Sequence, residues 1–573
     1  MMISPNRLFI ASLLVGLSVS PVSARDYYVD YANGDDSRDG RTPATAWKHA
    51  PGDNLAPATA AHQRLTLQPG DRLLFKGGVR YRRPIMPRGA GTADNPAVID
   101  GSSWGPGRAI FDGSNLLPGA RKCISAAECF GNPNWKQLWR IPIPADARWT
   151  DWLFAGDRPL QPAQYPDLPL YRADDISKYL VIPRDRTAAL RAGAITHPFP
   201  ASFAKGSPVL GLWIQGNTVA FTDAITVTTA GIAVTGSAWV NGSLHPYLDR
   251  ENRFTLLNVP DQVKRPGTYA VSVKDGFAIA WPWTPLATDF SIGGRREGIN
   301  MGRLNHTEIR GFTFANYAAR PGAYSTGIAI LGSSSTQGNI ISDNVLQSAV
   351  TFAHGRAYLT VISSSTIIRN NIIQQLPWSS AVQIDNSSGP TLIQCNHIQD
   401  IGRTGIRLTN TANVTVRDNF ITRLINIHGN GITFYSDTRN ASVINNIVTK
   451  TDRPLTMNGN YNNYFPSGEK SLYISKNIFS TDNPTSSAII SYGNTQNATL
   501  VDNFLSAPSK ALDLRGTEVN FSAQGNTLVG TVLVHNKANI FDHSANIFQE
   551  PDGNGQLLTG SIPGGGLPEQ CRQ

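Results

Sequence analysis

The chain has 573 residues, and its 50 Lys and Arg against 41 Asp and Glu give a formal net charge of +9. Its four cysteines are too few for a disulfide framework, and their spacing fits neither a zinc site nor an iron–sulfur centre, so we expect no metal and no cofactor. The cations stand singly on predicted loops, which argues against a nucleic-acid partner and favours an acidic polysaccharide, although a charge surplus can also serve solubility alone.

Residues 1–24 are predicted to be a secretory signal peptide. Arg7 supplies the positive charge, residues 8–19 form the apolar stretch, and Val22-Ser23-Ala24 is a small-residue cleavage site. No other stretch is apolar enough to span a membrane, so we expect no membrane partner. The sequence therefore predicts an exported protein, periplasmic or extracellular, whose mature chain begins near Arg25.

The cysteines are expected to meet an oxidising compartment after export. Cys123 and Cys129 are six residues apart in a stretch rich in Gly and Pro, and we predict that they close a loop. A bond between Cys395 and Cys571 is conceivable, but no sequence pattern supports it.

Residues 25–120 alternate short strands with turns of Asn, Asp, Gly and Pro. Strands or strand–turn units are predicted within Asp26–Asp30, Pro69–Gly78, Ala97–Gly101 and Ala109–Gly113. Residues 121–296 are dense in aromatic residues and prolines, with strand-like tracts at Trp152–Pro159 and Phe277–Pro282. We interpret residues 121–296 as a β-rich insertion near the N-terminal end.

The opening segment and the two tracts of the insertion resemble those of bacterial right-handed parallel β-helix proteins that act on carbohydrates. That superfamily includes pectate lyases, alginate lyases, chondroitinase B and several glycoside hydrolase families. The resemblance implies an architecture and a class of substrate, but it does not imply one reaction.

Residues 297–552 are predicted to form the main stack, and from about Asn339 to Asn526 they repeat one phrase: an aliphatic pair, a polar residue, Asn and another aliphatic pair. The recurring residues are Asn344, Asn371, Asn396, Asn419, Asn446, Asn477, Asn503 and Asn526, at intervals of 23 to 31 residues. Strand-like runs fill each interval, and no helical period is present, so successive coils are predicted to stack in parallel about 4.8 Å apart. We expect an all-β, right-handed parallel β-helix whose Asn residues form a ladder, followed by a flexible tail at residues 553–573.

A second strand recurs in every coil, and its alternation predicts one polar wall. Ile406 and Leu408 should point inward, while the residues between them point outward. The outward columns are predicted to be Gln383, Arg407, Thr433 and Thr456, with Asp385, Thr409, Tyr435 and Asn458 beside them.

The loops that enter this strand add further polar and aromatic residues. We predict that substrate binds to Gln383, Asp400, Asn430, Trp378, Arg453, His354 and Arg356. Arg403 and His428 lie on the same loops, so neighbouring coils should bring them close to Arg407.

A lyase that acts on a uronic acid needs a cation for the carboxylate, a base for the C5 proton and an acid for the leaving oxygen. Arg403 and Arg407 are the candidate cations, His428 the candidate base, and Tyr435 its acid or base partner. Each of them also has a structural interpretation: Arg407 paired with Asp385 or Asp400, His428 shaping a turn, and Tyr435 capping a stack. The sequence favours β-elimination of an acidic polysaccharide.

Three alternatives stay open. A glycoside hydrolase would need two carboxylates, and Asp385 with Asp400 or Asp437 could supply them, although no Glu occurs between Arg310 and Gly468. An epimerase would share the C5 proton abstraction. A catalytically inert solenoid that binds glycans or serves as a structural element would need none of this chemistry.

Overall fold

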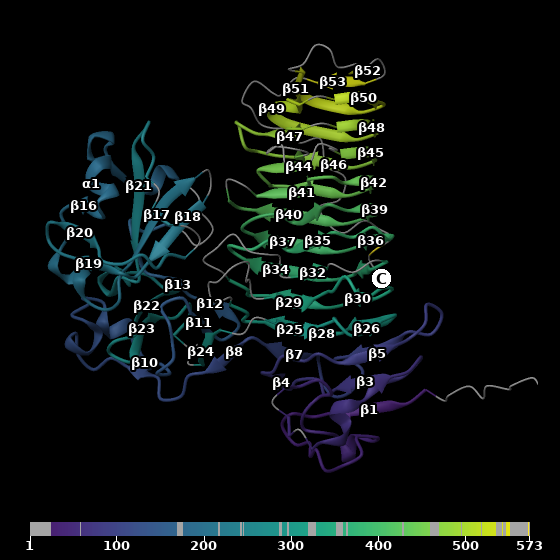
Figure 1. The fold of residues 1–573 in the computed structure, drawn as a ribbon, viewed down its shortest axis with the longest axis horizontal. Coiled ribbons are helices and arrows are strands. Elements are labelled where there is room, and N and C mark those ends of the chain that lie inside the picture. Colours follow the sequence, from purple (N-terminus) through teal and green to yellow (C-terminus); the bar gives the residue numbers. More distant parts are fainter. Residues whose placement is uncertain are drawn as a thin grey trace, which may run out of the picture.

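The computed structural model describes residues 24–54, 56–57, 59–168, 176–215, 218–240, 243–244, 246–285, 289–294, 297–318, 328–350, 359–361, 365–426, 429–458, 469–493, 495–516, 518–534, 541–542, 546–549 and 571. The described residues form mostly short β-strands, with one α-helix among them, α1 (Thr187–Arg191). The predicted signal peptide, apart from its last residue, and the predicted tail, apart from Cys571, lie outside these ranges. The strands coil into a right-handed parallel β-helix, and an antiparallel insertion stands beside it (Figure 1).

Each coil of the main stack contributes one strand to each of three parallel sheets, which we call sheets A, B and C. Sheet A contains β1 (Asp26–Val29), β3 (Arg72–Phe75), β6 (Ala97–Asp100), β27 (Thr307–Arg310), β30 (Ile340–Ser342), β33 (Ile367–Arg369), β36 (Thr391–Gln394), β39 (Ala412–Arg417), β42 (Arg439–Ile444), β45 (Glu469–Ser475), β48 (Thr495–Val501), β50 (Glu518–Gln524) and β52 (Phe541–Asp542). Sheet B contains β7 (Ala109–Asp112), β28 (Phe312–Ala315), β31 (Val345–Gln347), β34 (Ile372–Leu376), β37 (His397–Ile401), β40 (Phe420–Leu424), β43 (Ile447–Thr449), β46 (Ile478–Ser480), β49 (Phe504–Leu514), β51 (Thr527–Val534) and β53 (Ile547–Gln549).

Sheet C completes each coil. It contains β25 (Glu297–Asn300), β29 (Ile328–Leu331), β32 (Leu359–Val361), β35 (Val382–Asp385), β38 (Ile406–Thr409), β41 (Asn430–Tyr435), β44 (Arg453–Asn458) and β47 (Ser487–Ser491). The long strand β49 runs through both sheets, because it pairs first with β46 and then with β47.

The predicted asparagine ladder lies at the corner between sheets A and B, and the structure confirms it. Asn419 is fully buried; its Nδ2 donates to the Ile393 carbonyl at 2.9 Å and to Asn446 Oδ1 at 2.9 Å. Its own Oδ1 accepts from the backbone N–H of Asn396 at 3.0 Å. The same pattern runs from Asn344 to Asn526, and Asn546 adds one further rung. Each rung thus fixes the register of the next coil.

The residue before each ladder Asn turns the corner in the left-handed region. Asp343 has φ of 55° and Asp418 has φ of 59°, as do their counterparts in neighbouring coils within a few degrees. Asn and Asp tolerate this conformation better than other non-glycine residues, which explains their frequency here. The three Asp residues before ladder positions, Asp343, Asp418 and Asp502, are therefore turn formers.

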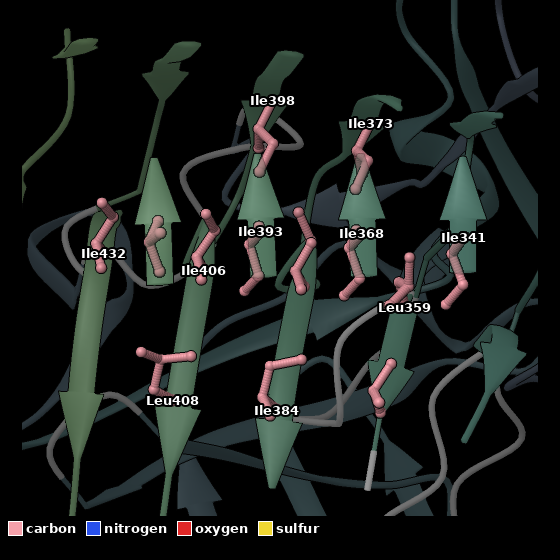
Figure 2. Close-up of a cluster of buried hydrophobic side chains, with 14 of the residues drawn as sticks. Ile341, Leu359, Ile368, Ile373, Ile384, Ile393, Ile398, Ile406, Leu408 and Ile432 are labelled. Atoms are coloured by element: carbon pink, nitrogen blue, oxygen red, sulfur yellow. The ribbon is translucent and has the colours of Figure 1, made fainter. Parts of the chain in front are cut away.

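Aliphatic side chains stack inside the coils in the same register. Ile368 lies over Ile341 and under Ile393 in sheet A, and Leu408 lies beside Ile384 in sheet C (Figure 2). All five are fully buried. Burial of such side chains contributes about 1.5–3 kcal/mol each, so the core is the main source of stability along the stack.

The insertion is antiparallel almost throughout, unlike the coils. Its strands are β8 (Ser114–Leu116), β9 (Arg121–Lys122), β10 (Trp139–Pro142), β11 (Trp152–Ala155), β12 (Arg158–Pro159), β13 (Gln161–Pro162), β14 (Gln164–Tyr165), β15 (Leu180–Ile182), β16 (Ala194–Thr196), β17 (Val209–Gln215), β18 (Thr218–Thr222), β19 (Ile225–Val227), β20 (Gly231–Val234), β21 (Asn252–Leu257), β22 (Thr268–Ser272), β23 (Phe277–Trp281) and β24 (Phe290–Gly293). Arg80 ties it to the β-helix by contacting Asp112 at 2.8 Å and Asp157 at 2.7 Å. The apolar core of the insertion also includes Ala318 and Val350 from the coils.

The cysteines form two disulfides. Cys123 bonds Cys129, which confirms the predicted loop, and Cys395 bonds Cys571. The second bond links the end of the chain to a corner turn of the ladder, across a sequence separation of 176 residues.

The ladder predicts that removal of a buried amide lowers the free energy of unfolding more than removal of an amide on the solvent side. Asn419→Ala leaves the carbonyl of Ile393 and the N–H of Asn396 without buried partners, so we expect it to lower the free energy of unfolding by about 3 kcal/mol. Urea unfolding followed by circular dichroism measures the loss.

Gln374→Ala is the matched control, because Gln374 belongs to an amide ladder on the solvent side of sheet B, with Gln399 donating to it at 3.0 Å. Water can replace that partner, so we expect a loss below about 1 kcal/mol. Equal losses for the two variants would contradict the role given to the buried ladder.

Candidate functional site

The outer surface of sheet C carries the two predicted columns, and the strand register confirms them. Gln383 pairs with Arg407, Arg407 with Thr433, and Thr433 with Thr456. In the column beside it the order is Asp385, Thr409, Tyr435 and Asn458. Ile406 and Leu408 point inward and are fully buried, so no slip of register turns Arg407 away from this surface.

Arg407 and Tyr435 form a stacked pair at the centre of the columns. The guanidinium carbon lies 4.2 Å from the centroid of the Tyr435 ring, and Arg407 Nε donates to Thr409 Oγ1 at 3.3 Å. Both side chains are half-buried. A guanidinium over an aromatic face keeps its edge available for a bidentate contact with a carboxylate.

Arg407 has no carboxylate partner among the described residues, unlike six other arginines of the stack. Ion pairs join Arg369 to Glu308, Arg417 to Asp418, Arg423 to Asp400, Arg439 to Asp437, Arg453 to Asp452 and Arg515 to Asp513. The structural interpretation of Arg407 as a partner of Asp385 or Asp400 is therefore not what the geometry shows. Its charge is available to an anionic ligand.

Asp385 lies one rung before Thr409 and carries one unused oxygen. Gln383 Nε2 donates to Asp385 Oδ2 at 2.7 Å, whereas Asp385 Oδ1 is buried without a hydrogen-bond partner in the described structure. A buried carboxylate oxygen is costly unless water or a ligand completes it.

Several neighbouring polar atoms are in the same condition. The oxygens Asn430 Oδ1, Thr433 Oγ1, Thr456 Oγ1 and Asn458 Oδ1 are all buried without a hydrogen-bond partner in the described structure. They lie on consecutive strands, β41 and β44, in paired register. Such a concentration of incomplete hydrogen bonds on one wall indicates a surface that binds water or a polar ligand.

The other predicted carboxylates are engaged elsewhere. Arg423 Nε contacts Asp400 Oδ1 at 2.8 Å, at the end of sheet B, whereas Asp385 is the last residue of its sheet C strand. Asp437 binds Arg439 at 2.7 Å through both oxygens. Asp385 pairs in register with Thr409 and not with either of them.

The remaining predicted residues are distributed around this surface. Arg403 lies half-buried in the turn before β38, and Arg453 pairs in register with Asn430. Trp378 packs against the apolar core of the insertion, and its Nε1 is buried without a hydrogen-bond partner among the described residues. His428, His354 and Arg356 lie outside the described residues, and their roles stay predictions.

The structure adds residues that the sequence pattern did not single out. Tyr492 and Arg515 extend the outer column beyond Asn458, because Tyr492 N–H donates to the Met457 carbonyl and Arg515 N–H to the Ser491 carbonyl. The strand register shifts within β49, between Ser506 and Leu512, so the residues of this rung do not fall at the positions that the repeating phrase gives. The available signal was Tyr492 itself, which follows the inward residues of β47 as Tyr435 follows those of β41.

No helix among the residues that the structure describes is long and apolar enough to cross a membrane. No three His, Cys, Asp or Glu side chains of the described ranges lie together as a metal site.

Comparisons with known proteins agree on the architecture. The family described as "Periplasmic copper-binding protein (NosD)" matches residues 233–483, which is less than half of the chain. No curated protein matches the sequence.

Three solved structures are similar over most of the chain. A structure titled "Glycoside hydrolase" has 13% identity and a TM-score of 0.53, covering 96% of this chain and 100% of its own. XylC in complex with xylose has 13% identity and a TM-score of 0.47, covering 88% and 75%. The GH136 lacto-N-biosidase from Eubacterium ramulus has 10% identity and a TM-score of 0.33, covering 92% and 68%. At such identities the likeness is one of fold, and the fold of this chain is that of the pectate-lyase-like right-handed parallel β-helix proteins.

Proposed function

We propose that this chain is an exported enzyme that cleaves an acidic, uronate-containing polysaccharide by β-elimination on the outer surface of sheet C. The observation that carries the proposal is Arg407, which is half-buried, stacked on Tyr435 at 4.2 Å, and not paired with a described carboxylate. A cation held in this way matches the carboxylate of a uronic acid.

The chemistry assigns a task to each group. Arg407 binds the uronate carboxylate and stabilises the negative charge that spreads onto it when the C5 proton leaves. A base takes that proton, the C4–O4 bond breaks, a double bond forms between C4 and C5, and an acid returns a proton to the leaving oxygen. Tyr435 lies beside Arg407 as the acid or base, with His428 as the predicted base and Arg403 as a second cation.

The distribution of carboxylates argues for elimination over hydrolysis. A glycoside hydrolase of the usual kind needs two carboxyl groups on either side of the scissile bond. Asp385, on the wall of sheet C, forms no ion pair with a cation of the described structure, while Asp400, Asp437 and Asp452, outside this wall, each form an ion pair with an arginine. Asp385 alone does not supply the two carboxyl groups that a glycoside hydrolase needs.

Glycoside hydrolysis is the second candidate, and Asp385 is the observation that favours it. Its Oδ1 is buried without a hydrogen-bond partner in the described structure, so this oxygen is free to bind a sugar hydroxyl or the glycosidic oxygen. The structural neighbour titled a glycoside hydrolase has the same fold along its full length. A second carboxyl group would then have to come from outside the described residues or from the substrate.

The only reason to consider copper as a ligand is the description of the matched family as copper-binding. Copper sites in proteins use histidine, cysteine and methionine ligands. All four cysteines of this chain are in disulfides, and the described residues contain no cluster of three metal-binding side chains. The residues that the structure describes therefore do not fit a copper site, and no step of the proposed reaction uses one.

Export is supported by two independent features. The first 24 residues have the charged start, apolar stretch and cleavage site of a signal peptide. Both disulfides are of the kind that persists in oxidising compartments.

The reaction type is tested by its product. Incubation of the purified protein with uronate polymers should produce absorbance near the ultraviolet edge from the new C4–C5 double bond, in step with new reducing ends. Reducing ends without that absorbance would contradict elimination and support the hydrolase.

The site is tested by two substitutions. Tyr435→Phe removes the proton-transferring hydroxyl and should lower kcat by about 10²–10⁴-fold. Arg407→Ala removes the stabilising charge and should lower kcat/KM by about 10²–10³-fold. Initial rates on a uronate polymer measure both.

Arg417→Ala is the control, because Arg417 is an exposed arginine on sheet A that contacts Gln394 and Asp418. We expect its turnover to match the wild type. Full activity in both Tyr435→Phe and Arg407→Ala, with the native circular dichroism spectrum retained, would remove the site from sheet C.

A further inference from the structure

A second cationic cluster lies on the same wall, two rungs beyond Tyr435. Its centre is Tyr492, which follows Asn458 in the outer column. The guanidinium carbon of Arg453 is 5.7 Å from the Tyr492 ring centroid, and that of Arg515 is 5.4 Å from it. Arg453 comes from the preceding coil and Arg515 from the following one, so the ring has a cation on either side along the stack.

The local charge of this cluster is positive. Its cations are Arg453, Arg515 and Lys510, and its carboxylates are Asp452 and Asp513, which leaves one net positive charge. Lys510 and Arg515 both contact Asp513 Oδ2, at 3.0 and 2.8 Å. Burial alone would raise the pKa of Asp513, but the hydrogen bonds from Arg515 and Lys510 outweigh burial and lower it.

The arginines themselves face solvent. The Arg515 side chain is 39% exposed and that of Arg453 is 24% exposed, while Asp513 is fully buried beneath them. The Arg453 Nε lies 3.7 Å from Asp452 Oδ2, beyond hydrogen-bond distance. Asp513 therefore anchors one guanidinium from below, and the outer edges of the two arginines stay accessible.

Between Tyr435 and Tyr492 the outer column holds the uncharged Asn458, at the end of the strand that begins with Arg453. Thr456 Oγ1 and Asn458 Oδ1 are buried there without hydrogen-bond partners in the described structure. Successive rungs are about 4.8 Å apart, so Tyr435 and Tyr492 are separated by roughly 10 Å along the axis. Two cationic positions thus flank one polar, uncharged position in a straight line.

We propose that Tyr492, Arg453 and Arg515 form a second subsite, which binds an anionic sugar of the same glycan chain that occupies Arg407 and Tyr435. The glycan then runs along the axis of the β-helix. Between its two acidic units, a sugar hydroxyl supplies the missing hydrogen bonds of Thr456 Oγ1 and Asn458 Oδ1. This inference rests on the proposed function and deepens it: the substrate presents negative groups on one side of its chain at every second sugar. The arginines over the Tyr492 ring bind the oxyanion, while the edge and the hydroxyl of Tyr492 contact the sugar.

Kinetics on uronate oligosaccharides of two lengths test the subsite. For a hexasaccharide, Arg515→Gln and Tyr492→Ala should each raise KM about 10-fold and leave kcat nearly unchanged, because each substitution removes an interaction with a sugar that lies away from the reacting bond. For the shortest oligosaccharide that is still cleaved, which does not reach Tyr492, KM should stay at the wild-type value. Arg417→Gln, on sheet A, should change neither. An unchanged KM for the hexasaccharide, or an equal rise for both lengths, would overturn the subsite.

Calorimetric binding separates failure of the subsite from failure of the proposed reaction. The Tyr435→Phe protein is titrated with a uronate hexasaccharide and with a sulfated neutral hexasaccharide, and the two arms distinguish carboxylate from sulfate as the anion. If the wild type cleaves no uronate polymer, the proposed function fails, but loss of hexasaccharide affinity on adding Arg515→Gln or Tyr492→Ala still supports the subsite.

Unchanged affinity in both double variants, or no binding of either hexasaccharide, would overturn it. Arg453→Gln is a further variant in case Arg515→Gln, which leaves Asp513 with Lys510 alone, fails to fold. It should weaken hexasaccharide binding in the same direction, and retained affinity in a folded Arg453→Gln protein would count against the subsite.

Discussion

The buried asparagine ladder is the interaction on which the rest of this structure depends. Each ladder amide joins its coil to the next through the side chain and the backbone, as Asn419 does with Asn396 and Asn446. A buried amide has no water to replace a missing partner, so a coil that slips by one residue leaves donors and acceptors unsatisfied. The ladder therefore reinforces the register that burial of the aliphatic side chains also requires.

The register between coils brings the residues of the candidate site together. Residues 24 or more positions apart along the chain, such as Gln383 and Arg407, become neighbours because their strands pair. Elsewhere the stack uses its carboxylates to hold its arginines, as in Arg423 with Asp400. The outer wall of sheet C differs. Arg407 there stacks on the Tyr435 ring and contacts no described carboxylate, and several buried oxygens lack hydrogen-bond partners in the described structure. Unbalanced charge and incomplete hydrogen bonds in one place are the physical marks of a ligand surface.

The predicted columns on sheet C were correct for a simple physical reason. Side chains alternate with a period of two in any strand, so one inward residue, Ile406, determines the direction of Arg407. The Asp residues before ladder positions were also interpreted correctly, because few other residues adopt the left-handed turn. The partner of Asp400 could not be predicted, because Arg423 is 23 residues away and meets it only when the coils of sheet B stack.

By itself the sequence determined that this chain is a β-helix, where its ladder runs and which side chains face outward, because these properties follow from periodicity within single strands and from the repeat of one phrase. Only the tertiary structure decided which charges are cancelled. Three features depend on contacts between distant segments. Arg407 has no carboxylate partner among the described residues, Tyr492 and Arg515 continue the wall beside the irregular strand β49, and Trp378 packs on the insertion. Ion pairing is short-ranged and insensitive to sequence spacing, so it becomes visible only when the coils are in place.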